Sequence, residues 1–114
     1  MRCEKSCRIT GVDDPQLLVA SHIKPWRSCD TTQERLDPQN GLLFTPHVDL
    51  LFDRGLLGID DDGRVLLSGL VSRDTLSKLG LEKLTCFNAG AFTDRQKHYL
   101  DYHRKYVLLS SSAD

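Results

Sequence analysis

Two short apolar runs predict the first two strands of the protein. The first run, Leu17–Ala20, has strand length and leads into a strand that we expect to end at His22. The second run is Leu42–Phe44, and we expect its strand to begin at Asn40. The chain between the runs is polar and allows a helical turn at most, over Thr31–Glu34. This pattern predicts a pair of strands with polar residues at the joins.

A helix is expected directly after the second strand. Thr45 is suited to the N-cap position and Pro46 to the first helical position. Apolar residues then recur at helical spacing, which indicates one buried face. Gly55 is a residue type that commonly ends a helix. We therefore expect this helix over about residues 46–53.

Three further elements are expected in the second half of the chain. Residues 56–67 consist of two apolar stretches around an acidic turn, which is typical of a β-hairpin. Ser72–Leu79 has the start signal and length of a short helix. Thr93 and Gln96 fit a capping box, which predicts a longer helix over about residues 94–106.

The composition is that of an ordinary globular protein. The 114 residues suffice for one domain with a modest core, so we expect a single domain over 1–114 with its functional core at 17–55. Hydrophobic residues make up 39% and charged residues 27%, which excludes a disordered chain. The four cysteines are irregularly spaced, which argues against a zinc ribbon.

Charge and hydropathy restrict the partners that the protein can have. The net charge of −1 gives no overall basic field, so attraction to phosphates must come from local Lys and Arg or from a bound cation. No apolar run approaches the ~20 residues of a membrane-spanning helix. The first residues have no signal-peptide pattern. These features predict a cytoplasmic protein that has no membrane partner.

Several blocks of residues occur in a specific order along the chain: Cys7–Gly11, Ser21–Trp26, Asp37–Leu43, Asp53–Gly55 and, in the closing helix, Gln96–Arg104. In this order they resemble the HNH endonucleases, in particular the bacterial restriction-type subfamily. The resemblance implies an α+β protein with a ββα-metal (His-Me finger) nuclease core, to which the hairpin and the C-terminal helix are added. It also implies a metal-dependent endonuclease that hydrolyses DNA phosphodiester bonds. A separate recognition domain or subunit often accompanies members of this family.

The same resemblance implies roles for individual residues. His22 looks like the general base of the family, and Asn40 looks like the middle Asn that orients the loop carrying this His. The family usually places a metal ligand nine residues after that Asn, and this position is Asp49. Three basic residues flank the site and could hold backbone phosphates: Lys24, Arg27 and Arg54.

Helix spacing independently supports a metal site on the expected helix. Asp49 and Asp53 are four residues apart and share one helix face, and their carboxylates suit Mg²⁺ or Mn²⁺. His47 lies about 200° around the helix from Asp49, so it would join the site only through a distorted first turn. A softer ion such as Zn²⁺ or Ni²⁺ would favour His47. We expect Asp49 as the primary ligand, Asp53 as a supporting one and His47 as a secondary one.

Ser21 departs from the family pattern and keeps a second interpretation open. Many members carry Asp or His as a metal ligand directly before the base, and Ser is a poor replacement. One hypothesis is an active endonuclease that uses one divalent metal ion. The alternative is a nuclease-fold module with weakened catalysis that binds DNA or another protein. Metal-dependent nicking of plasmid DNA discriminates between the two.

Overall fold

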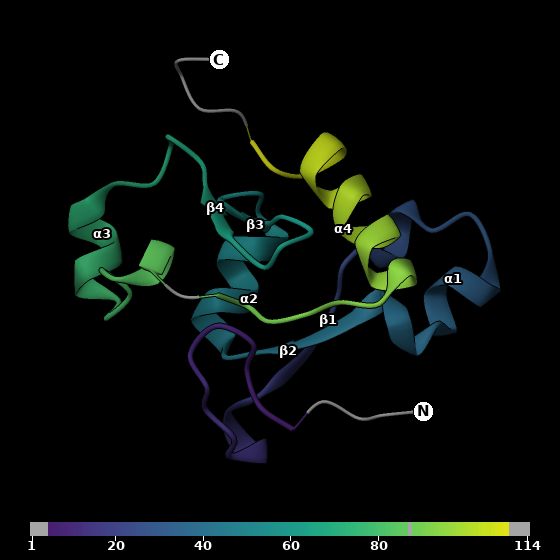
Figure 1. Cartoon of the computed structure of the whole chain (residues 1–114), viewed down its shortest axis with the longest axis horizontal. Coiled ribbons are helices and arrows are strands. Elements are labelled where there is room, and N and C mark those ends of the chain that lie inside the picture. The colour runs from purple at the N-terminus through teal and green to yellow at the C-terminus, as the bar shows by residue number, and fades with distance from the viewer. Residues whose placement is uncertain (1–4, 87, 110–114) are drawn as a thin grey trace.

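Short strands and helices follow one another in an order close to the predicted one (Figure 1). The computed structural model describes residues 5–86 and 88–109. These ranges contain two antiparallel strand pairs and, near the C-terminal end, the longest helix. In chain order the elements are β1 (Val19–His22), α1 (Thr32–Leu36), β2 (Gly41–Phe44), α2 (Pro46–Asp53), β3 (Leu57–Ile59), β4 (Val65–Leu67), α3 (Arg73–Lys78) and α4 (Asp94–Tyr106).

The strand pair β1–β2 and helix α2 have nearly the predicted bounds. β1 ends at His22, and β2 begins directly after Asn40. The two strands are antiparallel, with His22 opposite Gly41. One expectation was wrong, because Leu17 does not belong to the first strand. It lies in a 3-10 turn that Asp14 caps, and its side chain is 52% exposed.

Gly55 ends α2 as predicted and also brings this helix against the end of α4. Its φ of +77° lies in the left-handed region that favours glycine. A Cβ atom at this position would collide with the carbonyl oxygen of Val107. The backbone N–H of Leu109 donates to the Gly55 carbonyl at 2.8 Å. This close approach joins the element that carries Asp53 to the C-terminal part of the chain.

The core lies between α2, the two strand pairs and α4. Phe44 of β2 and Phe52 of α2 are fully buried, with ring centroids 5.1 Å apart. α4 has the predicted bounds, and both hydrogen bonds of the capping box between Thr93 and Gln96 are present. Its Leu100 is also fully buried. Helix α4 therefore closes this side of the core through Tyr99 and Leu100.

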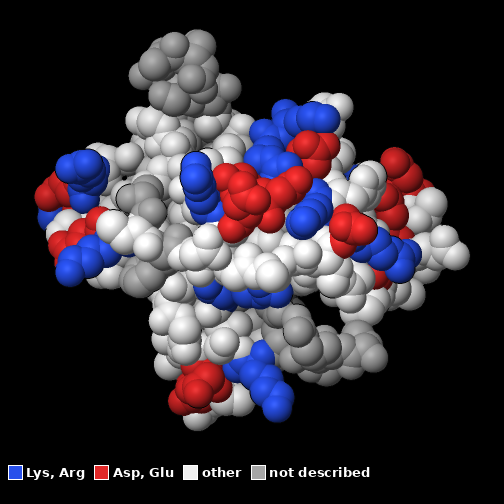
Figure 2. Space-filling view, in the orientation of Figure 1, with Lys and Arg blue, Asp and Glu red and all other residues white. Residues whose placement is uncertain are grey.

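The remaining elements confirm the predicted hairpin and short helix. β3 and β4 pair antiparallel, and Ser72 caps α3 by accepting a hydrogen bond from Thr75 N–H. On the face shown in Figure 2, Lys and Arg side chains lie among Asp and Glu, so this face presents no patch of one sign. No helix in the described part of the chain is long and apolar enough to cross a membrane.

Candidate active site

His22 ends β1, and the loop that follows holds its ring. The Nε2 atom lies 2.8 Å from the carbonyl oxygen of Arg35. Because a carbonyl oxygen only accepts, Nε2 carries the proton, and Nδ1 of the neutral ring has a free lone pair. Within the described part of the chain Nδ1 has no hydrogen-bond partner, and it is not a buried atom. His22 therefore presents an accessible proton acceptor.

Trp26 covers one edge of this histidine. The two rings meet edge to face, with centroids 5.4 Å apart and planes at 86°. The Arg35 guanidinium lies over the Trp26 ring, 5.3 Å from its centroid. Trp26 is nevertheless 53% exposed. The backbone carbonyl of Arg35 thus contacts His22 directly. Its side chain packs on Trp26, which in turn contacts His22.

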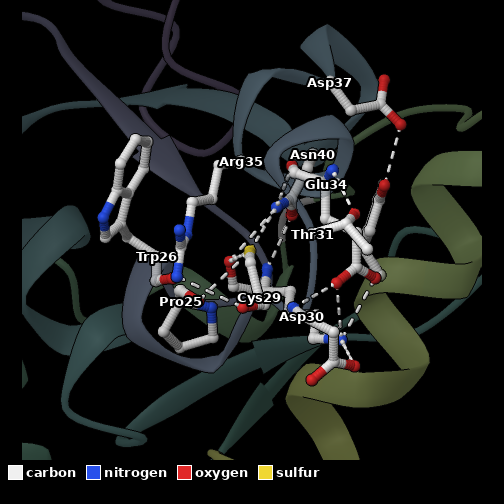
Figure 3. A network of polar contacts seen from close by, with 11 residues as sticks. Pro25, Trp26, Cys29, Asp30, Thr31, Glu34, Arg35, Asp37 and Asn40 are labelled. Carbon is white, nitrogen blue, oxygen red and sulfur yellow. Dashed lines mark hydrogen bonds and ion pairs between the residues drawn. The ribbon is translucent and has the colours of Figure 1, made fainter.

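Asn40 is almost completely buried and ties the loop after β1 to β2 (Figure 3). Its Oδ1 accepts from the Lys24 N–H at 2.7 Å, and its Nδ2 donates to the carbonyls of Lys24 and Glu34, both at 3.2 Å. Glu34 directly precedes Arg35, whose carbonyl holds His22. Asn40 thus holds the backbone next to the residue that contacts His22, as expected for an Asn that orients the base.

Lys24 lies inside the protein rather than on a surface that could meet phosphates. Its side chain is 8% exposed, and its Nζ lies 3.1 Å from Glu34 Oε1 and 3.5 Å from Asp30 Oδ2. The ammonium also lies over the Tyr102 ring, 4.7 Å from the centroid. Burial lowers the pKa of Lys24, but the two carboxylates outweigh this effect and hold the pKa above its ordinary value. This placement speaks against the expected phosphate contact and favours a structural role.

Helix α4 braces the turn that delivers Asn40. Asp37 caps this 3-10 turn, because its Oδ1 accepts from the Gln39 N–H at 2.9 Å. Its Oδ2 accepts from Tyr99 Oη at 2.8 Å and forms an ion pair with Arg95, whose Nε lies 3.2 Å away. Burial, together with Asp37, raises the pKa of Tyr99 to about 12. The Tyr99 hydroxyl therefore stays a hydrogen-bond donor over the whole physiological pH range.

A pocket of about 330 Å³ lies where β1, the loop after it and α2 meet. It brings His22 together with Asp49 and Asp53, the two carboxylates that the sequence placed on one helix face. His47 is not among the described residues that line it, as its position around the helix predicts. The lining residues are Val19, Ala20, Ser21, His22, Pro25, Trp26, Arg27, Asp49 and Asp53.

A second pocket of about 670 Å³ adjoins the first and shares Pro25, Arg27 and Asp53 with it. Two of the three residues expected to hold phosphates, Arg27 and Arg54, are thus placed beside the pocket of His22. Within the described part of the chain, neither arginine forms an ion pair, and neither do Asp49 and Asp53. The other lining residues are Ser28, Arg54, Leu56, Tyr102, Tyr106 and Val107.

The donors in the first pocket fit a hard divalent cation. Among the described residues, no group of three or more His, Cys, Asp and Glu side chains is placed to hold a metal ion. The charged oxygen donors that line the pocket are the carboxylates of Asp49 and Asp53. Mg²⁺ is usually held by one or two carboxylates, with water and substrate phosphates as its other ligands. Such a set suits Mg²⁺ or Mn²⁺ and does not suit a closed zinc site.

His103 contacts the helix that carries the two carboxylates, and it was not among the predicted site residues. It is fully buried in α4 and stacks on Phe52, with centroids 3.7 Å apart and planes at 9°. Its Nε2 lies 2.8 Å from the Phe52 carbonyl, while Nδ1 is buried without a partner. Burial lowers the pKa of His103 from 6.5 to about 4, against the opposing effects of Phe52 and Asp53. This neutral ring fixes the last turn of α2, which carries Asp53.

Comparison with known proteins agrees with this geometry. Residues 7–60 match the family model of the HNH endonucleases. This segment belongs to the HNH endonuclease family. It contains β1, β2, α2 and all residues that line the 330 Å³ pocket. No curated protein matches the chain significantly. Membership of the HNH family indicates a nuclease that acts on DNA, and HNH nucleases generally use divalent metal ions.

Proposed function

We propose that the protein is a metal-dependent DNA endonuclease of restriction type in which His22 is the general base. The observation that carries the proposal is the pocket that joins His22 to Asp49 and Asp53. In this reading β1, β2 and α2 form a ββα-metal core, while the β3–β4 hairpin and α4 are additions that support it. The whole of residues 1–114 is proposed to act as one cytoplasmic domain.

Hydrolysis of a phosphodiester requires removal of a proton from the attacking water. Neutral His22 accepts this proton at Nδ1, because its Nε2 proton is engaged by the Arg35 carbonyl at 2.8 Å. The same carbonyl then stabilises the positive charge that the ring acquires. Asn40 acts as a positioning residue, since it fixes the backbone next to Arg35. The geometry of the base therefore depends on hydrogen bonds that exist before any substrate binds.

Four further side chains of the two pockets are proposed to bind the metal ion and the substrate. Asp49 and Asp53 would bind the divalent ion, which neutralises negative charge that develops on the phosphate oxygens. Arg27 and Arg54 bind flanking phosphates of the DNA backbone, because a guanidinium group pairs with phosphate oxygens through two parallel hydrogen bonds. We leave Lys24 and His47 out of these roles, since Lys24 is internally paired and His47 lies outside the pocket.

A weakened nuclease module that binds DNA or another protein is the second candidate function. The observation that favours it is Ser21, which lines the pocket but supplies no charged ligand on the strand side. A metal ion would then have only the carboxylates of α2 as charged protein ligands. Binding could persist in such a module while cleavage is slow.

Nicking of supercoiled plasmid with Mg²⁺, with Mn²⁺ and with a chelator tests the proposal. We expect nicking with either ion and none with the chelator. Calorimetric titration of Mn²⁺ into the wild type and into Asp49→Ala and His47→Ala tests the ligands. Asp49→Ala should weaken binding, and His47→Ala should leave it unchanged. The reverse pattern would assign the ion to His47, and an absence of both nicking and metal binding would favour the binding module.

A further inference from the structure

We propose that the 670 Å³ groove between the loop after β1, the end of α2 and the last turns of α4 binds one unpaired nucleotide beside the cleaved phosphate. The location beside the cleaved phosphate rests on the proposed function, whereas binding of the nucleotide can be tested independently. The groove has a size that suits a small ligand such as a nucleotide. It adjoins the pocket of His22, because Pro25, Arg27 and Asp53 line both.

The charges of the groove suit the phosphate of a nucleotide. Arg27 and Arg54 are both exposed, and neither is paired with a carboxylate in the described part of the chain. Asp53 also lines the groove and would repel a phosphate, so the two guanidinium groups are needed to offset it. Lys24 lies nearby but is already paired with Glu34. The unpaired positive charge of the groove is therefore carried by its two arginines.

The aromatic side of the groove suits a nucleobase. Tyr102 and Tyr106 lie one helical turn apart on α4, with ring centroids 4.7 Å apart and planes at 42°. Lys24 Nζ lies over the ring of Tyr102. Tyr106 is 72% exposed, so its ring is available to stack on a base. Such stacking is a common way in which proteins bind single-stranded nucleic acid.

The occupant has to be unpaired because of how bases are arranged in a duplex. Within a duplex each base is stacked on its neighbours, and only its edges are accessible in the grooves. Tyr106 could contact the face of a base only after that base has left the stack. Extrusion costs least where a nucleotide has no partner. DNA with a bulge or another unpaired nucleotide should therefore bind more tightly than a continuous duplex.

Binding of two short duplexes in the presence of a chelator tests the proposal without cleavage. One duplex carries a single bulged 2-aminopurine, and the other carries the same base fully paired. We expect the wild type to bind the bulged duplex more tightly by fluorescence anisotropy and to quench its 2-aminopurine emission. Tyr106→Ala should weaken binding of the bulged duplex by roughly five- to one-hundred-fold, as for loss of one stacked base, and should leave the paired duplex unchanged.

Tyr106→Phe is the matched control, because it keeps the ring and removes only the hydroxyl, and it should bind like the wild type. Arg54→Ala should weaken both duplexes alike and lower the slope of log Kd against log salt by about one. Equal binding of the two duplexes by the wild type, or unchanged binding of the bulged duplex by Tyr106→Ala, would overturn the proposal. Plasmid nicking separates the two claims. If nicking fails while Tyr106 still discriminates, the groove binds a nucleotide and only the nuclease assignment falls.

Discussion

Two histidines, one in the pocket and one behind it, have the same hydrogen bond and different surroundings. Nε2 of His22 and Nε2 of His103 each lie 2.8 Å from a backbone carbonyl, those of Arg35 and Phe52 respectively. This bond gives both rings the same tautomer, with a bare Nδ1. The Nδ1 of His22 is accessible, whereas that of His103 is buried without a partner. Accessibility of Nδ1, and not the tautomer, separates a possible base from a structural residue.

The two histidines also lie in different parts of the chain. His22 lies in the segment that matches the HNH family, and His103 lies in α4, outside that segment. α4 contacts the segment from behind, through Tyr99 on Asp37 and through His103 on Phe52. These contacts hold the turn before Asn40 and the end of α2. The C-terminal helix therefore supports the proposed site without itself supplying the proposed base.

The largest effect is expected for His22→Ala. Removal of a general base typically lowers the rate on the order of 10²–10⁴-fold. Plasmid nicking with Mn²⁺ should show this loss, while circular dichroism and Mn²⁺ calorimetry should show an intact fold and metal site. His98→Ala is the matched control, because His98 is an exposed histidine of α4 that lines neither pocket.

Nicking by His22→Ala at the wild-type rate would exclude His22 as the base. Restoration of nicking by added imidazole would support the assignment further.

Asn40→Ala is expected to affect stability and cleavage together. The substitution leaves the Lys24 N–H and the carbonyls of Lys24 and Glu34 without their partner in a buried site. Unsatisfied buried groups cost about 1–3 kcal/mol each, and three groups are affected, so we expect urea unfolding to show a loss of at least about 3 kcal/mol. Nicking should fall even in buffers where the variant is folded, because the backbone of Glu34, directly before Arg35, is no longer held by Asn40. A variant that is destabilised but nicks normally would show that Asn40 does not position the base.

The pH dependence of stability should reveal His103. Its pKa is about 4 in the folded protein and 6.5 in the unfolded chain, so between these values the unfolded chain binds more protons. The stability that His103 confers is complete above pH 6.5 and is lost as the pH falls toward 4, by up to about 3 kcal/mol. Urea unfolding measured across this range should show the decline. It should be smaller in His103→Gln, and an identical decline in the two proteins would contradict the assignment.

The sequence predicted the elements whose ends carry local signals. Pro46 and Gly55 mark the two ends of α2, and Thr93 with Gln96 marks the start of α4, because caps and turn residues act over a few positions. The grouping of His22 with the α2 carboxylates followed from the family resemblance, and the pocket agrees with it. For helix α1, the sequence indicated one turn at most, whereas five residues are helical.

Contacts between distant residues could not be predicted in this way. The sequence groups Lys24 with Arg27 as a phosphate contact because both residues flank the predicted site. Its burial depends on Glu34 and on Tyr102, which lies 78 positions further along the chain. The acceptor for His22 is a backbone carbonyl, and every residue has one, so no side-chain pattern identifies it. Both features follow from tertiary packing rather than from local sequence.

The role of His22 as the base is tested most directly by the ¹⁵N NMR spectrum of the imidazole rings in protein labelled at histidine. The spectrum is recorded at about pH 8, where the unperturbed imidazole of histidine is neutral. We predict that His22 then carries its proton on Nε2 and has a bare Nδ1. His103 should show the same tautomer and stay neutral until the pH approaches 4. A His22 protonated on Nδ1 at pH 8 would contradict the central claim, because the nitrogen that must accept the proton of water would already be occupied.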